Sequence, residues 1–249
     1  MFSSTDIAAN ASQVLRRIAE IASRAGREPA SVRLVAVSKT VSPERILEAY
    51  DCGLRHFGEN RVQEFLQKLP RLHLPEASFH LIGHLQSNKV HQAMAFDWLQ
   101  TIDSLRLAQR LQNAATEANK KIPVLVQVKL GDEEAQEAQE AKTGISESEL
   151  SRLMTQLVPL DRLDLRGLMT LPPYTEDPEG ARPYFRRLRQ LRDQLQDAGF
   201  SQVRELSMGM THDFAVAIEE GATMVRIGTA IFGPRNAARS RDDSPATGT

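Results

Sequence analysis

The sequence lacks most of the features that mark secreted, membrane-bound or nucleic-acid-binding proteins. Cys52 is the only cysteine, so no internal disulfide can form, and a reducing cytoplasm is the expected location. The formal net charge is -1, which gives neither nucleic acid nor an anionic membrane a positive surface to bind. No apolar run is long enough to cross a bilayer, and the first residues lack the basic-then-apolar pattern of a signal peptide. With 41% hydrophobic and 25% charged residues, the composition indicates an ordinary globular protein.

Several common catalytic motifs are also missing. The sequence contains no H-E-x-x-H, G-x-S-x-G or G-K-[ST], which leaves metal hydrolases, serine hydrolases and P-loop enzymes without support. His80 and His84 have the spacing of a helical metal pair, but "FHLIG" has the composition of a strand. Four residues along a strand span about 13 Å, too far for two ligands of one ion. We therefore predict no metal site.

The pattern that is present is an alternation of strands and helices. Apolar, β-branched runs such as "VRLVAVS", "SFHLIG", "PVLVQVKL" and "TMVRIG" are separated by stretches with helical spacing. The alternation repeats about eight times over about 250 residues, which is typical of a single-domain (β/α)8 TIM barrel. Two of the runs are short, so an open doubly wound sheet remains the alternative. No G-x-G-x-x-G follows the first strand, which disfavours a dinucleotide-binding sheet.

The two ends and one loop differ from this alternation. The spacing of apolar residues from Thr5 to Arg24 predicts an amphipathic helix, and we expect residues 1–26 to pack on a barrel that extends to residue 235. Residues 236–249 are small and polar, which predicts a disordered tail. The acidic segment "GDEEAQEAQEAKTG" (131–144) falls in a predicted strand-to-helix loop, where it indicates a solvated surface or a short helical extension.

The predicted C-terminal ends of the strands supply the candidates for chemistry, because barrel enzymes place their sites there. Lys39 follows the first apolar run, and "GEN", with Glu59 and Asn60, follows the second. Most lysines at strand ends extend to water. Positive neighbours and desolvation would instead lower the pKa of the Lys39 amine and make it reactive toward a carbonyl.

Two glycine-containing loops near the C-terminus predict a phosphate site. "SMGMT", from Ser207, and "GT", at Gly228 and Thr229, offer hydroxyls and closely approachable backbone after the last two predicted strands. The alternative is that Thr211 and Thr229 simply cap helices.

Arg226 lies on the same face of its predicted strand as Met224 and Gly228. If that face points into the barrel, the guanidinium group needs partners. The alternatives are a role in ligand binding and an ion pair with an acidic neighbour such as Glu205.

Several segments together resemble a known family. "LVAVSKT", "HFGENRVQE", "FHLIGHLQSNK", "GLMTL" and "LSMGMTHDFAVAIEEGATMVRIGTAIFG" occur in this order. They are similar to the pyridoxal phosphate homeostasis proteins, from about Val32 to Phe232. The resemblance implies a fold-type III barrel, like the N-terminal barrel of alanine racemase, that binds pyridoxal 5'-phosphate (PLP).

The resemblance also implies roles for individual residues. Lys39 matches the family's Schiff-base lysine, Asn60 a residue beside the cofactor, and Arg226 the arginine that faces the pyridine nitrogen. The phosphate cradle is matched by Ser207, Met208, Gly228 and Thr229. A non-catalytic role as a PLP carrier in vitamin B6 and amino-acid or keto-acid homeostasis follows as an expectation.

Two other functions remain open. Racemases of this fold use a tyrosine supplied by the partner subunit of a two-domain enzyme, and this chain lacks the length for a second domain. Its tyrosines, Tyr50, Tyr174 and Tyr184, do not fall at predicted strand ends, so we expect no rapid turnover. The single-domain length and the balanced charge predict a monomer. A small PLP-dependent racemase or decarboxylase is the main alternative. A sugar-phosphate enzyme using Lys39 as an aldolase-type amine is a more distant one.

Overall fold

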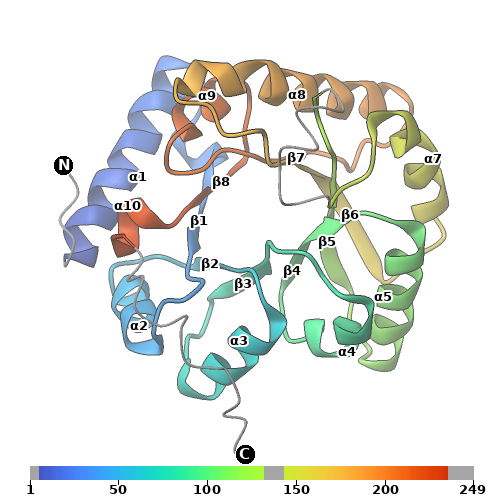
Figure 1. Ribbon diagram of the computed structural model, residues 1–249, viewed down its shortest axis with the longest axis horizontal. Coiled ribbons are helices and arrows are strands. Elements are labelled where there is room, and N and C mark those ends of the chain that lie inside the picture. The colour runs from blue at the N-terminus through green and yellow to red at the C-terminus, as the bar shows by residue number, and fades with distance from the viewer. Residues whose placement is uncertain (1–5, 132–142, 235–249) are drawn as a thin grey trace, which may run out of the picture.

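The structure is a computed structural model that describes residues 6–131 and 143–234 (Figure 1). The predicted tail, 236–249, lies outside the described residues, and so does most of the acidic segment 131–144. Among the residues that are described, no helix combines the length and the apolar character needed to cross a membrane.

Eight parallel strands form a closed barrel in chain order, with helices around the outside (Figure 1). The strands are β1 (Arg33–Val37), β2 (His56–Glu59), β3 (Ser78–Leu81), β4 (Trp98–Ile102), β5 (Ile122–Gln127), β6 (Leu163–Met169), β7 (Glu205–Ser207) and β8 (Met224–Ile227). Pairing of β1 with β8 closes the ring, with Val35 opposite Arg226. The predicted barrel is therefore confirmed, and the open sheet is wrong. The short strands β2 and β7 still pair on both sides.

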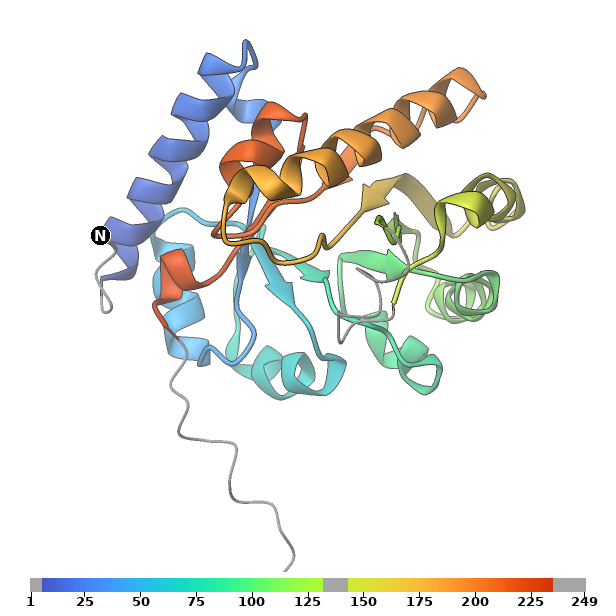
Figure 2. The same cartoon turned by 45° about the horizontal axis from the view of Figure 1, so that its top comes forward.

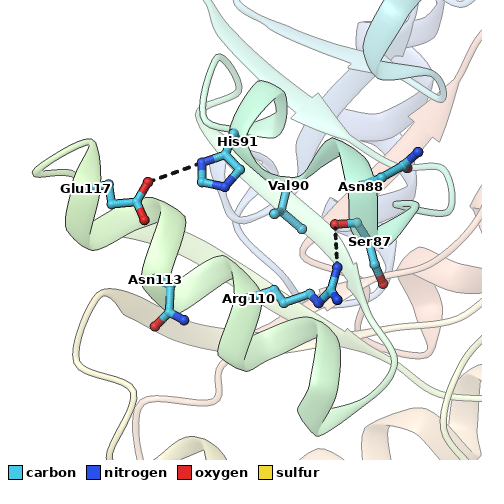
Figure 3. A pocket seen from close by; sticks show the side chains of 7 residues that line it. All are labelled: Ser87, Asn88, Val90, His91, Arg110, Asn113 and Glu117. Carbon is cyan, nitrogen blue, oxygen red and sulfur yellow. Dashed lines mark hydrogen bonds and ion pairs between the residues drawn. The ribbon is translucent and has the colours of Figure 1, made fainter.

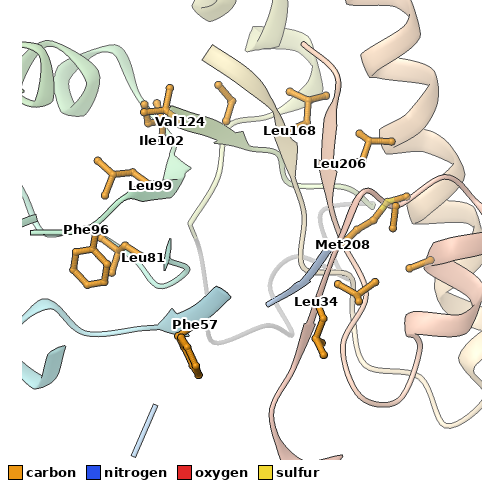
Figure 4. Packing of buried hydrophobic residues seen from close by; sticks show 14 of the residues in the cluster. Leu34, Phe57, Leu81, Phe96, Leu99, Ile102, Val124, Leu168, Leu206 and Met208 are labelled. Carbon is orange, nitrogen blue, oxygen red and sulfur yellow. The ribbon is translucent and has the colours of Figure 1, made fainter. Parts of the chain in front are cut away.

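Side-chain alternation along each strand separates two apolar regions. Val35, Leu125, Met169 and Met224 pack together as one small cluster, and Leu34 and Ala36, which flank Val35, belong to the large second cluster. Because successive side chains of a strand point to opposite faces, the small cluster lies in the barrel interior and the large one lies between strands and helices. Figure 4 shows strand residues of the large cluster, including Leu34 and Phe57.

The helices surround the barrel on its outer side (Figure 1). The α-helices are α1 (Ile7–Arg24), α2 (Pro43–Asp51), α3 (Val62–Lys68), α4 (Val90–Ala93), α5 (Leu105–Glu117), α7 (Glu147–Leu157), α8 (Arg182–Asp197), α9 (Phe214–Glu219) and α10 (Thr229–Phe232). The 3-10 helices are η1 (Pro29–Ser31), η2 (Leu69–Arg71), η3 (Ser87–Lys89) and η4 (Pro178–Ala181).

Helix α1 agrees closely with its prediction. Asp6 caps it by accepting a hydrogen bond from the Ala9 N–H, and Gly26, with φ +69°, follows its C-terminal end. The residues of the predicted apolar stripe are buried: Ile7, Ala11, Val14, Ile18 and Ile21. They face α2, α9 and α10, so the N-terminal helix packs across the β8–β1 side of the barrel (Figure 2).

Candidate functional site

Lys39 lies at the mouth of the barrel, two residues beyond the end of β1. Its position in the alternation is that of Val35, whose side chain belongs to the interior cluster. The Val41 N–H donates to the Ser38 carbonyl at 3.0 Å, so Lys39 and Thr40 are the central residues of a tight turn. The strand thus ends in a turn that places a half-buried lysine at the rim.

The two strands beside β1 bring other predicted site residues to the same part of the rim. On one side, an added Cβ at Gly228 would lie 3.2 Å from the Val37 carbonyl oxygen, so β8 ends directly against β1. On the other side, Val37 is opposite Gly58 on β2. Lys39 and Asn60 each lie two residues beyond this pair, so the register brings Asn60 level with Lys39.

Asn60 carries a buried acceptor without a partner. Its Oδ1 atom makes no hydrogen bond within the described structure. An unsatisfied buried acceptor costs about 1–3 kcal/mol, so such an atom at a barrel rim indicates a place for a donor on a bound molecule. The backbone here is tightly packed, because a Cβ on Gly83 would come within 2.2 Å of the Asn60 carbonyl oxygen.

Arg226 points into the barrel, because it shares a strand face with Met224 of the interior cluster, and it is only 3% exposed. One terminal nitrogen donates to Ser207 Oγ at 2.6 Å and the other to the Thr170 carbonyl at 2.8 Å. Burial lowers its pKa to about 10, partly offset by the nearby Asp213 carboxylate. The guanidinium is therefore protonated at neutral pH and held rigidly by two partners.

The alternative ion pair between Arg226 and Glu205 is wrong. Glu205 lies 3.8 Å from Arg33 instead and accepts a hydrogen bond from the Thr223 hydroxyl at 2.5 Å. Arg33 also lies over the Trp98 ring, 5.5 Å from its centroid. These contacts belong to the N-terminal ends of the strands, opposite the rim that carries Lys39.

A chain of polar side chains, which sequence reasoning missed, runs through the barrel interior from Arg226. Ser207 Oγ accepts from Arg226 and donates to Gln100 Oε1 at 2.6 Å. Gln100 Nε2 lies 2.9 Å from His80 Nδ1, and His80 Nε2 lies 3.2 Å from His56 Nδ1. An amide nitrogen only donates, so His80 must accept at Nδ1 and carry its proton on Nε2. Each link of the chain from Arg226 to His56 then pairs one donor with one acceptor.

The hydrogen-bond direction requires both histidines to be neutral. Protonated His80 would present a second donor to the amide nitrogen of Gln100. Burial lowers the His80 pKa well below its usual range, with further contributions from His56 and Arg33. Burial also lowers the pKa of His56 to about 4, again with a contribution from Arg33.

These pKa shifts predict that stability decreases on mild acidification. The unfolded chain takes up protons on both histidines near pH 6.5, whereas folded His56 resists protonation until about pH 4. Stability is therefore retained above pH 6.5 and lost as the pH falls toward 4, by about 1.4 kcal/mol per pH unit for each proton concerned. Urea unfolding of the wild type and of His80→Gln across this range measures the effect. The variant should show a slope smaller by about one proton, and equal slopes would contradict the assignment.

The two predicted phosphate loops meet through a pair of hydroxyls. Thr229 Oγ1 donates to Thr211 Oγ1 at 3.2 Å. Neither threonine caps a helix, because the N-cap residues are Asp213 for α9 and Gly228 for α10. The capping alternative is therefore wrong, and two threonine hydroxyls lie together where the loops after β7 and β8 converge.

Ser207 and Met208 turn their side chains away from these loops. The Ser207 hydroxyl is engaged with Arg226 and Gln100, as described above. The Met208 side chain is buried in the outer core, and its N–H donates to the Met224 carbonyl at 3.1 Å. Phosphate contacts from these two residues stay a prediction, and the hydroxyl that lies beside Thr229 is that of Thr211.

A surface groove of about 330 Å³ lies elsewhere, in the outer helical layer beside α4 and α5 (Figure 3). Arg110 donates to the Ser87 carbonyl at 3.2 Å, and His91 lies 3.4 Å from Glu117. The side chains of Arg110, His91 and Glu117 are thus exposed, and each already has a polar partner within the groove. The groove has no connection with Lys39 or Arg226, which lie at the rim and in the interior.

The chain is similar to known proteins in both sequence and structure. The alanine racemase N-terminal domain family matches residues 9–236. A pyridoxal phosphate homeostasis protein of Aquifex aeolicus is 47% identical over 225 residues, which cover 90% of this chain and 96% of that protein. PipY of Synechococcus elongatus, solved with PLP bound, is 40% identical, with a TM-score of 0.76 over 87% of this chain and all of that one.

Alanine racemase of Clostridium difficile shares the fold at lower similarity. It is 16% identical with a TM-score of 0.63, covering 90% of this chain and 56% of that enzyme. The higher identities to the Aquifex and Synechococcus proteins, together with the eight-stranded barrel and the lysine at its rim, indicate the family of this chain. The chain belongs to the pyridoxal phosphate homeostasis proteins, within the family that shares the alanine racemase N-terminal domain.

Proposed function

We propose that this protein binds pyridoxal 5'-phosphate at the rim formed by β7, β8, β1 and β2 and acts in intracellular vitamin B6 and amino-acid or keto-acid homeostasis. Its similarity to the pyridoxal phosphate homeostasis protein of Aquifex aeolicus and to PipY, solved with PLP bound, supports this function. When bound, PLP supplies an aldehyde that condenses with a primary amine, forming one carbon–nitrogen double bond and releasing one water.

The residues at the rim fit such a ligand. Lys39 would hold it covalently through its amine, and the unpartnered Oδ1 of Asn60 would accept a hydrogen bond from it. The paired hydroxyls of Thr211 and Thr229, with the close backbone at Gly228, would bind the phosphate. The observation that carries the proposal is that Lys39 and Asn60 follow neighbouring strands at the same level of the rim, and that the buried Oδ1 of Asn60 has no hydrogen-bond partner in the described structure.

Arg226 supports a binding role over a catalytic one. A protonated guanidinium facing the pyridine nitrogen donates a hydrogen bond and keeps that nitrogen unprotonated, which weakens the ring as an electron sink. The chain Arg226–Ser207–Gln100 holds the guanidinium in one orientation and supplies no carboxylate to it. We therefore propose a non-catalytic carrier, monomeric and cytoplasmic.

A racemase or decarboxylase is the second candidate, and one observation favours keeping it. The Tyr174 ring lies 5.5 Å from His212, next to Thr211 in sequence, so two titratable side chains stand beside the loop after β7. Tyr174 is 79% exposed. Tyr50 donates to the Pro75 carbonyl at 2.6 Å, on the helical side of the barrel, and so is not available to the rim.

Titration with PLP followed by amino-acid assays tests the two candidates. We expect a visible absorbance band that saturates at one PLP per chain and that borohydride removes. We also expect no sustained conversion when D- or L-amino acids are added to the loaded protein. Multiple turnover that Tyr174→Phe abolishes would contradict the carrier and establish the enzyme. A protein that PLP cannot colour would contradict both and return attention to a sugar-phosphate ligand.

A further inference from the structure

Behind the turn that presents Lys39 lies a group of three charged side chains: the buried Glu59 and Lys68 and the partly exposed Glu64. Lys68 Nζ lies 2.9 Å from Glu59 Oε1 and 2.6 Å from Glu64 Oε1. The same ammonium donates to the Ser38 carbonyl at 2.9 Å. An ammonium group has three donors, and these contacts use all of them.

The group fastens the chain on both sides of Lys39. Before it, the Ser38 carbonyl binds Lys68 directly, and the Ser38 hydroxyl donates to Glu59 Oε1 at 2.7 Å. After it, the Thr40 N–H donates to Glu64 Oε1 at 2.5 Å. Both neighbours of Lys39 are therefore connected to Lys68, one directly and one through a carboxylate.

The turn needs external contacts because its backbone is unfavourable. Thr40 has φ +63°, a left-handed conformation that β-branched residues rarely adopt. It occupies the third position of the turn, where this conformation ordinarily calls for glycine or asparagine. Such strained residues persist where the surroundings over-determine them. The tethers of Ser38 and Thr40 to one ammonium group meet that requirement.

Stability alone does not account for charges placed here. Lys68 is 8% exposed and Glu59 is fully buried. Apolar side chains of similar size often stabilise such a position as well as a buried ion pair does. Glu59 also has a second oxygen, Oε2, that is buried without a hydrogen-bond partner in the described structure. What the charged group provides, and an apolar one would not, is a set of directed contacts to the backbone around Lys39.

We propose that Lys68 is a positioning residue for covalent capture of PLP, holding the turn 38–41 in the conformation that brings the Lys39 amine to the aldehyde. This inference rests on the proposed function. Condensation requires the amine within close reach of the carbonyl carbon, and displacements of about 1 Å can cost about a hundredfold in rate. Binding of the ring and phosphate depends on other strands and does not need the turn.

The decisive comparison uses two ligands and two matched variants. Pyridoxine 5'-phosphate has an alcohol in place of the aldehyde and reports only on non-covalent binding. Lys68→Met should slow formation of the visible PLP band by about tenfold or more and leave pyridoxine phosphate affinity within about twofold. Lys120→Met is the control, because half-buried Lys120 likewise donates to two backbone carbonyls, of Met94 and Phe96, outside the rim. It should change neither ligand's binding.

Two further variants keep the test decisive if Lys68→Met folds poorly. Glu64→Ala removes the tether to Thr40 and one of the two carboxylates beside Lys68, from a partly exposed side chain, while the direct contact of Lys68 with Ser38 stays. It should slow band formation by about threefold or more. Thr40→Gly introduced into Lys68→Met removes the backbone strain and should restore much of the lost rate.

Each outcome has a distinct meaning. Wild-type rates in Lys68→Met, or an equal loss of both ligands with no rescue by Thr40→Gly, would overturn the positioning role. A wild-type protein that binds neither ligand would instead overturn the proposed function.

Discussion

Lys39→Ala should still bind PLP, but without a covalent link and about a hundredfold more weakly, since a lost covalent contribution of about 2.7 kcal/mol corresponds to that ratio. Its complex should lack the visible band that borohydride removes from the wild type. The reason is that Lys39 is the half-buried amine beside the Gly228 loop, whereas the other proposed contacts, at Asn60 and Thr229, cannot condense with an aldehyde. Absorbance titration before and after borohydride measures both effects.

Lys129→Ala is the matched control for this experiment. Lys129 lies two residues beyond the end of β5, as Lys39 lies two residues beyond β1, and it is also half-buried. Its strand stands away from β8 in the ring, so we expect a wild-type band. A full reducible band in Lys39→Ala, with loss of the band in Lys129→Ala, would move the attachment point to β5.

Arg226→Met should have the second large effect, on both stability and ligand affinity. The substitution leaves the Thr170 carbonyl and the Ser207 hydroxyl without their buried donor. We expect the free energy of unfolding to decrease by about 2–4 kcal/mol. PLP affinity should fall by about tenfold or more, because the ring would lose a charged hydrogen-bond donor. Urea unfolding and absorbance titration measure the two quantities.

Arg33→Met provides the comparison, because Arg33 is the arginine at the opposite end of the barrel. Its side chain is 33% exposed and its pair with Glu205 is long, at 3.8 Å. Loss of a long, partly exposed pair of this kind costs about 1 kcal/mol, and PLP affinity should be unchanged. If Arg226→Met binds PLP as tightly as the wild type, the guanidinium does not face the ligand.

The sequence predicted structure best where a feature depends on a single helix or strand. The stripe from Ile7 to Ile21 predicted α1, its buried face and its end at Gly26. The alternation of Met224 and Arg226 placed both on one strand face, and the structure shows that this face points into the barrel. These features depend on how side chains repeat along one helix or one strand, and that repeat can be read from the residues of the segment alone.

What sequence reasoning missed depends on strands distant in the chain. His80, Gln100 and Ser207 belong to β3, β4 and β7, and their hydrogen bonds exist only because the barrel closes around them. A signal was present, since each is a polar residue at an inward position of an apolar strand. The choice of partner required the register, as the wrong pairing of Arg226 with Glu205 illustrates.

The Lys39 turn is a similar case. Thr40 gives no sign in the sequence of a left-handed backbone, and Lys68 belongs to a helix whose charges suggest a solvated surface. Only the fold brings α3 behind the end of β1, so the contact of Lys68 with Ser38 spans 30 residues.

The most direct test of the account is peptide mass spectrometry of the PLP-loaded protein after borohydride reduction. We predict one reduced phosphopyridoxyl group per chain, on the peptide that contains Lys39, in the wild type and in Lys129→Ala. A label on Lys129 or Lys89, or no label on a protein that PLP visibly colours, would contradict covalent capture by Lys39.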